Sequence, residues 1–132
     1  MMLSNLEMVK STYEGDAKEN GLIYQAYLAE HAEWTEAAGF PYAGTYVGYE
    51  EIFHNVFSRL GSEWDNYMAK PKEFYEDENT IIVVGVYSGT YKLTGKFFEA
   101  DFVHIWRVEN GKIVRFKQYV DSHLVQASML SK

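Results

Sequence analysis

Apolar and polar residues alternate near the carboxyl end of the chain in two runs that meet at Asn110-Gly111. This dipeptide between alternating runs is a strong β-hairpin signal, because both central residues of a type I′ turn need a positive φ. We therefore predict two antiparallel strands within residues 102–121, with Glu109 opposite Lys112. Side chains alternate along a strand, so one face of this hairpin should carry a histidine, a carboxylate and three aromatic rings. They are Phe102, His104, Trp106, Tyr119 and Asp121, a set typical of a pocket wall.

Three helices are predicted in the first half of the chain. Two begin with the spacing of a capping box, in which an N-cap side chain and a glutamate three residues later satisfy each other's backbone N–H groups. The pairs are Ser4 with Glu7 and Asp16 with Glu19. The first helix should end near Gly15 and the second near residue 28. The third, about residues 49–60, has acidic residues in its first turn and an apolar stripe along one side.

The other segments favour strands and one loop. We predict strands at residues 31–36, 64–76 and 80–93, the second at a sheet edge because it contains Pro71. Residues 37–48 hold three glycines and a proline, which predicts an irregular loop able to cover a cavity mouth. The element order indicates a single α+β domain over residues 1–132, with helices packed on one face of a curved antiparallel sheet and a short C-terminal helix. Residues 81–86 are apolar on both faces, so we expect a homodimer through the sheet.

Composition excludes several classes of function. The net charge of −7 argues against nucleic acid as a partner, because binding to a phosphate backbone needs a basic face. The chain has no cysteine, and its four histidines lack the spacing of metal ligands, so we expect no metal. No apolar run approaches the roughly 18 residues of a membrane span, and the amino terminus lacks signal-peptide features, so we expect a cytoplasmic location and no membrane partner. Aromatic residues make up 17% of the chain, which favours a pocket for an apolar small molecule.

Four motifs in this order resemble the nuclear transport factor 2-like superfamily, in its SnoaL-like and ketosteroid isomerase-like branch. They are YEGD (13–16), LAEHAEWTE (28–36), FPYAGTYVGYEEI (40–52) and HIWRVENGKI (104–113). The resemblance covers nearly the whole chain. It implies a cone-shaped fold with a pocket between a concave sheet and the helices, commonly in a dimer. Enzymes of that superfamily isomerise steroids, close polyketide rings, dehydrate or open epoxides, whereas other members only bind or scaffold.

The resemblance also implies roles for three residues. Glu36 aligns with the general-base aspartate of ketosteroid isomerases, and His104 aligns with their protonated aspartate that donates to the oxyanion. Their oxyanion tyrosine has no counterpart, since the equivalent region here is residues 6–9 and Tyr13 lies about two turns later. SnoaL-like cyclases are similar in carrying a histidine and an aspartate that map to His104 and Asp121.

The position of Asp121 leaves alternatives open. With a two-residue turn, Asp121 pairs with Ala100, which lies four residues before His104. In a flat sheet this separates Asp121 from His104 by about 13 Å, so the two cannot form a direct dyad. They could flank one ligand, or a β-bulge near residues 116–118 could change the facing. Asp121 could instead cap the last helix. We expect the ligand to contact five aromatic side chains: Trp34, Phe40, Phe102, Trp106 and Tyr119.

Two hypotheses of different classes follow. The first is a cofactor-free enzyme that transfers a proton on an apolar carbonyl compound, as an isomerase, cyclase or dehydratase. Glu36 would be the base, His104 the hydrogen-bond donor or acid, and Asp121 a second carboxylate. The alternative is a non-catalytic ligand-binding or dimeric association module of the same fold. An epoxide hydrolase would need an arginine between two pocket carboxylates. It is disfavoured, because Arg107 alternates to the face opposite His104 and Arg115 lies near the turn of the hairpin.

Overall fold

A computed structural model of the protein describes residues 3–131. The helices are α1 (Asn5–Ser11), α2 (Ala17–Tyr27), α3 (Tyr49–Ile52), α4 (Ser58–Glu63) and α5 (Ser122–Met129), with a π-helical turn (Phe53–Phe57) between α3 and α4. The strands are β1 (Leu28–Glu36), β2 (Gly44–Val47), β3 (Trp64–Asp77), β4 (Thr80–Tyr91), β5 (Phe97–Glu109) and β6 (Lys112–Val120). Both predicted capping boxes are present, at Ser4 and at Asp16. The local signals for the first two helices are therefore confirmed.

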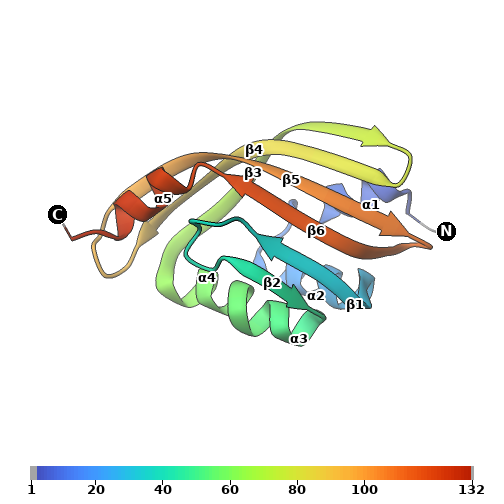
Figure 1. Ribbon diagram of the computed structural model, residues 1–132, viewed down its shortest axis with the longest axis horizontal. Coiled ribbons are helices and arrows are strands. Elements are labelled where there is room, and N and C mark those ends of the chain that lie inside the picture. The colour runs from blue at the N-terminus through green and yellow to red at the C-terminus, as the bar shows by residue number, and fades with distance from the viewer. Residues whose placement is uncertain (1–2, 132) are drawn as a thin grey trace.

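All six strands form one sheet in the order β2-β1-β6-β5-β4-β3. Figure 1 shows this sheet bending over α2, α3 and α4, which lie together on one side of it, while α5 lies at the end of β6. The predicted α+β plan is thus confirmed. The sheet is mixed rather than wholly antiparallel, because β1 pairs with β6 in parallel. As predicted, the strand that contains Pro71 is an edge strand, with a register shift between Pro71 and Glu73.

The segment predicted as one irregular loop contains a short strand. Residues 44–47 form β2, which pairs antiparallel with β1, so the loop is reduced to residues 37–43, with Gly48 alone between β2 and α3. Two aromatic side chains of this loop, Phe40 and Tyr42, are buried against the interior. Backbone hydrogen bonds from Phe40 N to Ala37 O and from Ala43 N to Phe40 O fold the loop on itself.

The predicted register of the β5–β6 hairpin holds only next to its turn. Asn110 and Gly111 have the positive φ values that the turn needs, and Glu109 pairs with Lys112. Val114 is then an extra residue on β6, so Arg107 faces Arg115 and every later partner is shifted by one. A β-bulge of this kind changes which side chains face inward. We considered a bulge near residues 116–118. The structure has a bulge at Val114 instead, closer to the turn.

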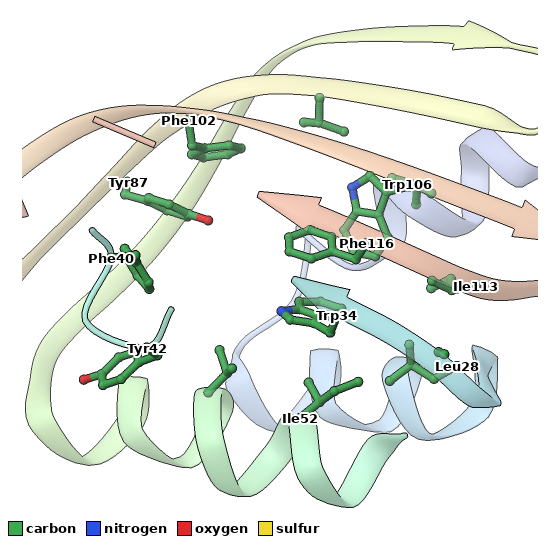
Figure 2. Packing of buried hydrophobic residues seen from close by; sticks show 14 of the residues in the cluster. Leu28, Trp34, Phe40, Tyr42, Ile52, Tyr87, Phe102, Trp106, Ile113 and Phe116 are labelled. Atoms are coloured by element: carbon green, nitrogen blue, oxygen red, sulfur yellow. The ribbon is translucent and has the colours of Figure 1, made fainter. Parts of the chain in front are cut away.

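The core lies between the concave sheet and the helices and consists largely of aromatic rings. Figure 2 shows Phe102, Trp106 and Phe116 projecting from the sheet toward Trp34. Phe40 and Tyr42 lie at one side of this cluster of rings. The rings of Trp34 and Phe116 stack at 3.8 Å between centroids. The predicted surplus of aromatic residues therefore lines the interior where a pocket was expected.

Candidate functional site

Glu36 ends β1 and lies inside the molecule. Its side chain is 4% exposed, and of the residues the structure describes it is the sole buried carboxylate. Burial raises the pKa of Glu36 to about 8, because removing water disfavours the charged form. The nearby indole N–H of Trp34 limits that rise, although it lies outside hydrogen-bonding geometry. At neutral pH Glu36 is therefore mostly a neutral acid that ionises near pH 8, which suits a group that must both take and return a proton.

His104 lies in the middle of β5 and is also 4% exposed. Its Nδ1 lies 2.5 Å from the hydroxyl oxygen of Tyr13, and its Nε2 is hydrogen-bonded to the hydroxyl of Tyr87. Burial lowers the pKa of His104 well below its usual range, so the ring is neutral. Two tyrosines, one from the turn after α1 and one from β4, thus hold the two sides of one neutral imidazole.

Gln118 connects this histidine group to Glu36. Its Oε1 accepts a hydrogen bond from Ala37 N at 3.1 Å, which fixes the orientation of the amide. Its Nε2 then donates to the Tyr87 hydroxyl at 2.8 Å and approaches Glu36 Oε1 at 3.5 Å. One amide nitrogen therefore serves both the carboxyl group and the tyrosine that contacts His104.

Two buried polar atoms beside Glu36 have no hydrogen-bond partner among the described residues. They are the indole nitrogen of Trp34 and the hydroxyl of Tyr67. Figure 2 shows the Trp34 nitrogen and the Tyr87 hydroxyl on the edges of their rings that face one another. Buried polar groups without partners are rare, and they mark places where a ligand oxygen or a water completes the hydrogen bonding. The centre of the interior is thus polar, and its walls are aromatic.

The structure separates the sequence-predicted site residues into two groups. Glu36 and His104 lie inside the molecule, together with Trp34, Phe40, Phe102 and Trp106. The other two point away, since Asp121 is exposed at the N-cap position of α5 and Tyr119 is 47% exposed. The prediction that they share the inner face with His104 is wrong, because the bulge at Val114 turns them outward. The side chain of Asp121 makes no capping hydrogen bond.

Sequence reasoning missed three members of this group. The register expected from a two-residue turn places Gln118 on the outer face, whereas the bulge at Val114 turns it inward. Tyr87 was hidden in a strand rich in valine and tyrosine, where alternation alone marks it as an inward residue. Tyr13 was set aside because a continuous helix would place it too late, whereas α1 ends at Ser11 and the following turn carries Tyr13 to His104.

Two surface hollows lie elsewhere, one beside Arg107 and Arg115 and one between α5 and the start of β5. Within residues 3–131, no cluster of three or more histidine, aspartate or glutamate side chains could hold a metal ion. None of the helices described is both long and apolar enough to cross a membrane.

Comparison with known proteins gives one family and many structures of the same fold. Residues 15–116 match the sequence profile of the SnoaL-like domain. An NTF2-like protein from Burkholderia thailandensis E264 is 45% identical, with a TM-score of 0.92 over 98% of this chain and 99% of that one. No protein among those with curated functions matches this chain.

Two structures of lower identity share the fold alone. TerC, co-crystallised with polyporic acid, is 23% identical, with a TM-score of 0.83 over 95% of this chain and 97% of that one. IdmH from Streptomyces antibioticus, described as a proposed polyketide cyclase, is 16% identical, with a TM-score of 0.77 over 96% and 99% of the two chains.

Proposed function

We propose that this chain, which belongs to the SnoaL-like domain family, is an enzyme that transfers a proton on an apolar carbonyl compound without a cofactor. The observation that carries the proposal is the buried carboxyl of Glu36, whose pKa is raised to about 8 beside the hydrogen-bonded group of His104. A perturbed carboxyl next to neutral hydrogen-bond donors is the arrangement that enolisation requires. The co-crystallisation of TerC with polyporic acid indicates that the fold accommodates organic ligands.

The proposed reaction uses Glu36 in both of its protonation states. Ionised Glu36 takes the proton from a carbon next to the carbonyl, and the electron pair of the broken C–H bond moves to the carbonyl oxygen. The resulting enolate is stabilised by hydrogen bonds from the group around His104. Protonated Glu36 then returns the proton to the same or another carbon of the conjugated system. Trp34, Phe40, Phe102 and Trp106 would hold the apolar body of the substrate.

Solvent deuterium exchange tests this proposal without knowledge of the natural substrate. A panel of cyclic enones and aryl ketones is incubated with the protein in deuterated buffer, and exchange at the α-carbon is followed by NMR. We expect exchange with the wild type and at least a hundredfold loss in Glu36→Gln, which keeps the shape of the side chain and removes the base. The matched control is Glu33→Gln, an exposed glutamate on the same strand.

Ligand binding separates the enzyme from the alternative of a binding module. Trp34 and Trp106 lie in the interior, so quenching of tryptophan fluorescence reports the occupied site. Glu36→Gln should bind the same ketones with little change in affinity. Binding without exchange by the wild type, or equal exchange by Glu36→Gln, would reject catalysis by Glu36 and leave the ligand-binding function.

We also propose that the protein forms a homodimer through the outer face of the sheet. Five aliphatic side chains on the face away from the helices are half-buried in the monomer: Ile82, Val84, Val86, Val103 and Ile105. Met68 and Tyr75 border them and are more than half exposed. We expect Val84→Glu to convert a dimer into a monomer in analytical ultracentrifugation, whereas Leu22→Glu, at an exposed position on α2, should not. A monomeric wild type would reject the dimer.

A further inference from the structure

The ring of His104 has no nitrogen left for a ligand. Nδ1 is hydrogen-bonded to Tyr13 and Nε2 to Tyr87, and the imidazole between them is buried. A ligand could reach either nitrogen only by displacing a tyrosine hydroxyl. The group that meets a substrate from this side is therefore one of the two tyrosines rather than the imidazole.

The number of protons available restricts the directions of the hydrogen bonds among Tyr13, His104 and Tyr87. Trp106 Nε1 donates to the Tyr13 hydroxyl oxygen at 3.0 Å, and Gln118 Nε2 donates to that of Tyr87 at 2.8 Å. A neutral imidazole has one N–H and one acceptor nitrogen. Either Tyr13 donates to Nδ1 and Nε2–H donates to Tyr87, or the directions of both bonds are reversed. Each arrangement leaves one tyrosine proton without an acceptor in the described residues, that of Tyr87 in the first and that of Tyr13 in the second.

The surroundings of the two hydroxyls favour the first arrangement. Part of the Tyr13 side chain is exposed, but its hydroxyl is bonded to the buried side chains of His104 and Trp106. Its ring also packs against those of Phe74 and Phe102, within 6.5 Å between centroids, so an unused proton on this hydroxyl is costly. The hydroxyl of Tyr87 shares the Gln118 amide with Glu36. The rings of Tyr67 and Tyr87 pack together at 5.4 Å between centroids. In the first arrangement the free proton therefore lies in the polar centre of the interior, next to the carboxyl group.

We propose that Tyr87 is the catalytic residue that donates a hydrogen bond to the reacting oxygen, and that His104 is a positioning residue that orients and polarises the Tyr87 hydroxyl. The inference rests on the proposed function, because the oxygen is the carbonyl oxygen that becomes an enolate when Glu36 removes the proton. The Tyr87 oxygen accepts two hydrogen bonds, from His104 and from Gln118, and both strengthen its O–H as a donor. No proton leaves Tyr87 in this step.

Binding of para-nitrophenolate tests the role of Tyr87. The anion mimics an enolate, and Glu36→Gln mimics the protonated carboxyl that accompanies the enolate, so the variant reproduces the charges of the intermediate. Absorbance of the phenolate gives its affinity for Glu36→Gln and for the double variant Glu36→Gln/Tyr87→Phe. We expect Tyr87→Phe to weaken binding by about ten- to a hundredfold, the effect of one hydrogen bond to a charged group. Tyr91→Phe, on the same strand and without a bond to His104, serves as control and should change nothing.

The tautomer of His104 tests its positioning role in the unmodified protein. Side-chain ¹⁵N NMR should show a neutral ring with the proton on Nε2, the state that leaves the Tyr87 proton free. This measurement needs no variant, so it decides the inference even if Tyr87→Phe fails to fold. A proton on Nδ1 would overturn the inference, because the Tyr87 proton would then be donated to His104.

The remaining outcomes separate this inference from the proposed function. If Glu36→Gln binds phenolate and Tyr87→Phe leaves that affinity unchanged, Tyr87 is not the donor, while the role of Glu36 stands on the exchange experiment. If Glu36→Gln does not bind the anion at all, an oxyanion donor at this place is rejected. Loss of exchange in Glu36→Gln together with weaker phenolate binding in the Tyr87 variant would support both.

Discussion

The hydroxyl of Tyr13 lies 2.5 Å from Nδ1 of His104, across 91 positions of the sequence. The same hydroxyl accepts the indole N–H of Trp106 at 3.0 Å. The turn after the first helix is therefore tied to the central strand by a single oxygen atom. We expect Tyr13→Phe to lower the free energy of unfolding by about 2–4 kcal/mol, because it leaves two buried polar groups without a partner.

Urea denaturation of the wild type and of Tyr13→Phe measures this difference, provided that the m-value is the same for both proteins. The matched control is Tyr49→Phe, whose hydroxyl accepts a hydrogen bond from the Gln25 amide at the surface. That change should stay within about 0.5 kcal/mol. An equal effect of the two substitutions would show that the bond between Tyr13 and His104 contributes nothing specific.

Ionisation of Glu36 should make the protein less stable as the pH rises. The folded pKa of about 8 lies above the ordinary glutamate value of 4.5, so the folded state binds the proton more tightly than the unfolded chain. The stabilisation is fully present below pH 4.5 and is lost as the pH rises through 8. The total effect is on the order of 3–5 kcal/mol.

Comparison with Glu36→Gln isolates this contribution. The pKa of His104 is lowered by burial, so its contribution has the opposite sign and is lost as the pH falls. Subtracting the stability of the variant from that of the wild type at each pH removes the effect of His104. The difference should fall between pH 5 and 8, and a flat difference would show that Glu36 is not buried as a neutral acid.

Turnover should follow the ionised form of Glu36. If Glu36 is the base, exchange catalysed by the free enzyme rises with pH and levels off above about pH 8, the pKa of its carboxyl. A rate profile of kcat/KM between pH 5 and 9 measures this value directly. A midpoint near the ordinary glutamate pKa would contradict a base in this apolar surround.

Gly85 gives Phe102 its place in the core. A Cβ at Gly85 would lie 2.6 Å from Cζ of the Phe102 ring and would also clash with the backbone oxygen of Lys70. We expect Gly85→Ala to destabilise the protein by about 2–4 kcal/mol, since neither neighbour can move freely. Gly21→Ala is the control, because nothing lies within 4 Å of its added methyl group, and it should be neutral or stabilising.

Tyr42 links the loop of residues 37–43 to α4 by a side-chain hydrogen bond. Its hydroxyl donates to Glu63 Oε1 at 2.5 Å and accepts the indole N–H of Trp64 at 3.0 Å, while Arg59 lies over its ring. Tyr42→Phe should cost about 1–3 kcal/mol and increase hydrogen exchange at the amides of Phe40 and Ala43. Exchange that is unchanged at these amides would show that the loop is held by its own turns.

The parts of the fold that could be predicted are those with local causes. A capping box at Ser4 or a turn at Asn110-Gly111 involves residues three or fewer positions apart, and each was found where expected. The parallel pairing of β1 with β6 joins segments far apart in the chain, and no local pattern specifies it.

The site was only half predictable for the same reason. Alternation in the predicted hairpin placed His104 on the pocket face, whereas the role of Glu36 followed only from the resemblance to ketosteroid isomerases. The partners of His104 depend on where α1 stops and on the register of β6, which are set by packing. Val114 resembles any other strand valine, so nothing in its identity announces an extra residue.

The bulge at Val114 shifts the register of the rest of β6 by one residue. One inserted residue exchanges the whole set of side chains that β6 presents inward, and no substitution is needed. With it, the wall carries Phe116 and Gln118; without it, Lys117, Tyr119 and Asp121 would turn inward. A sheet of this kind can therefore acquire a different chemistry by the gain or loss of a single codon near a turn.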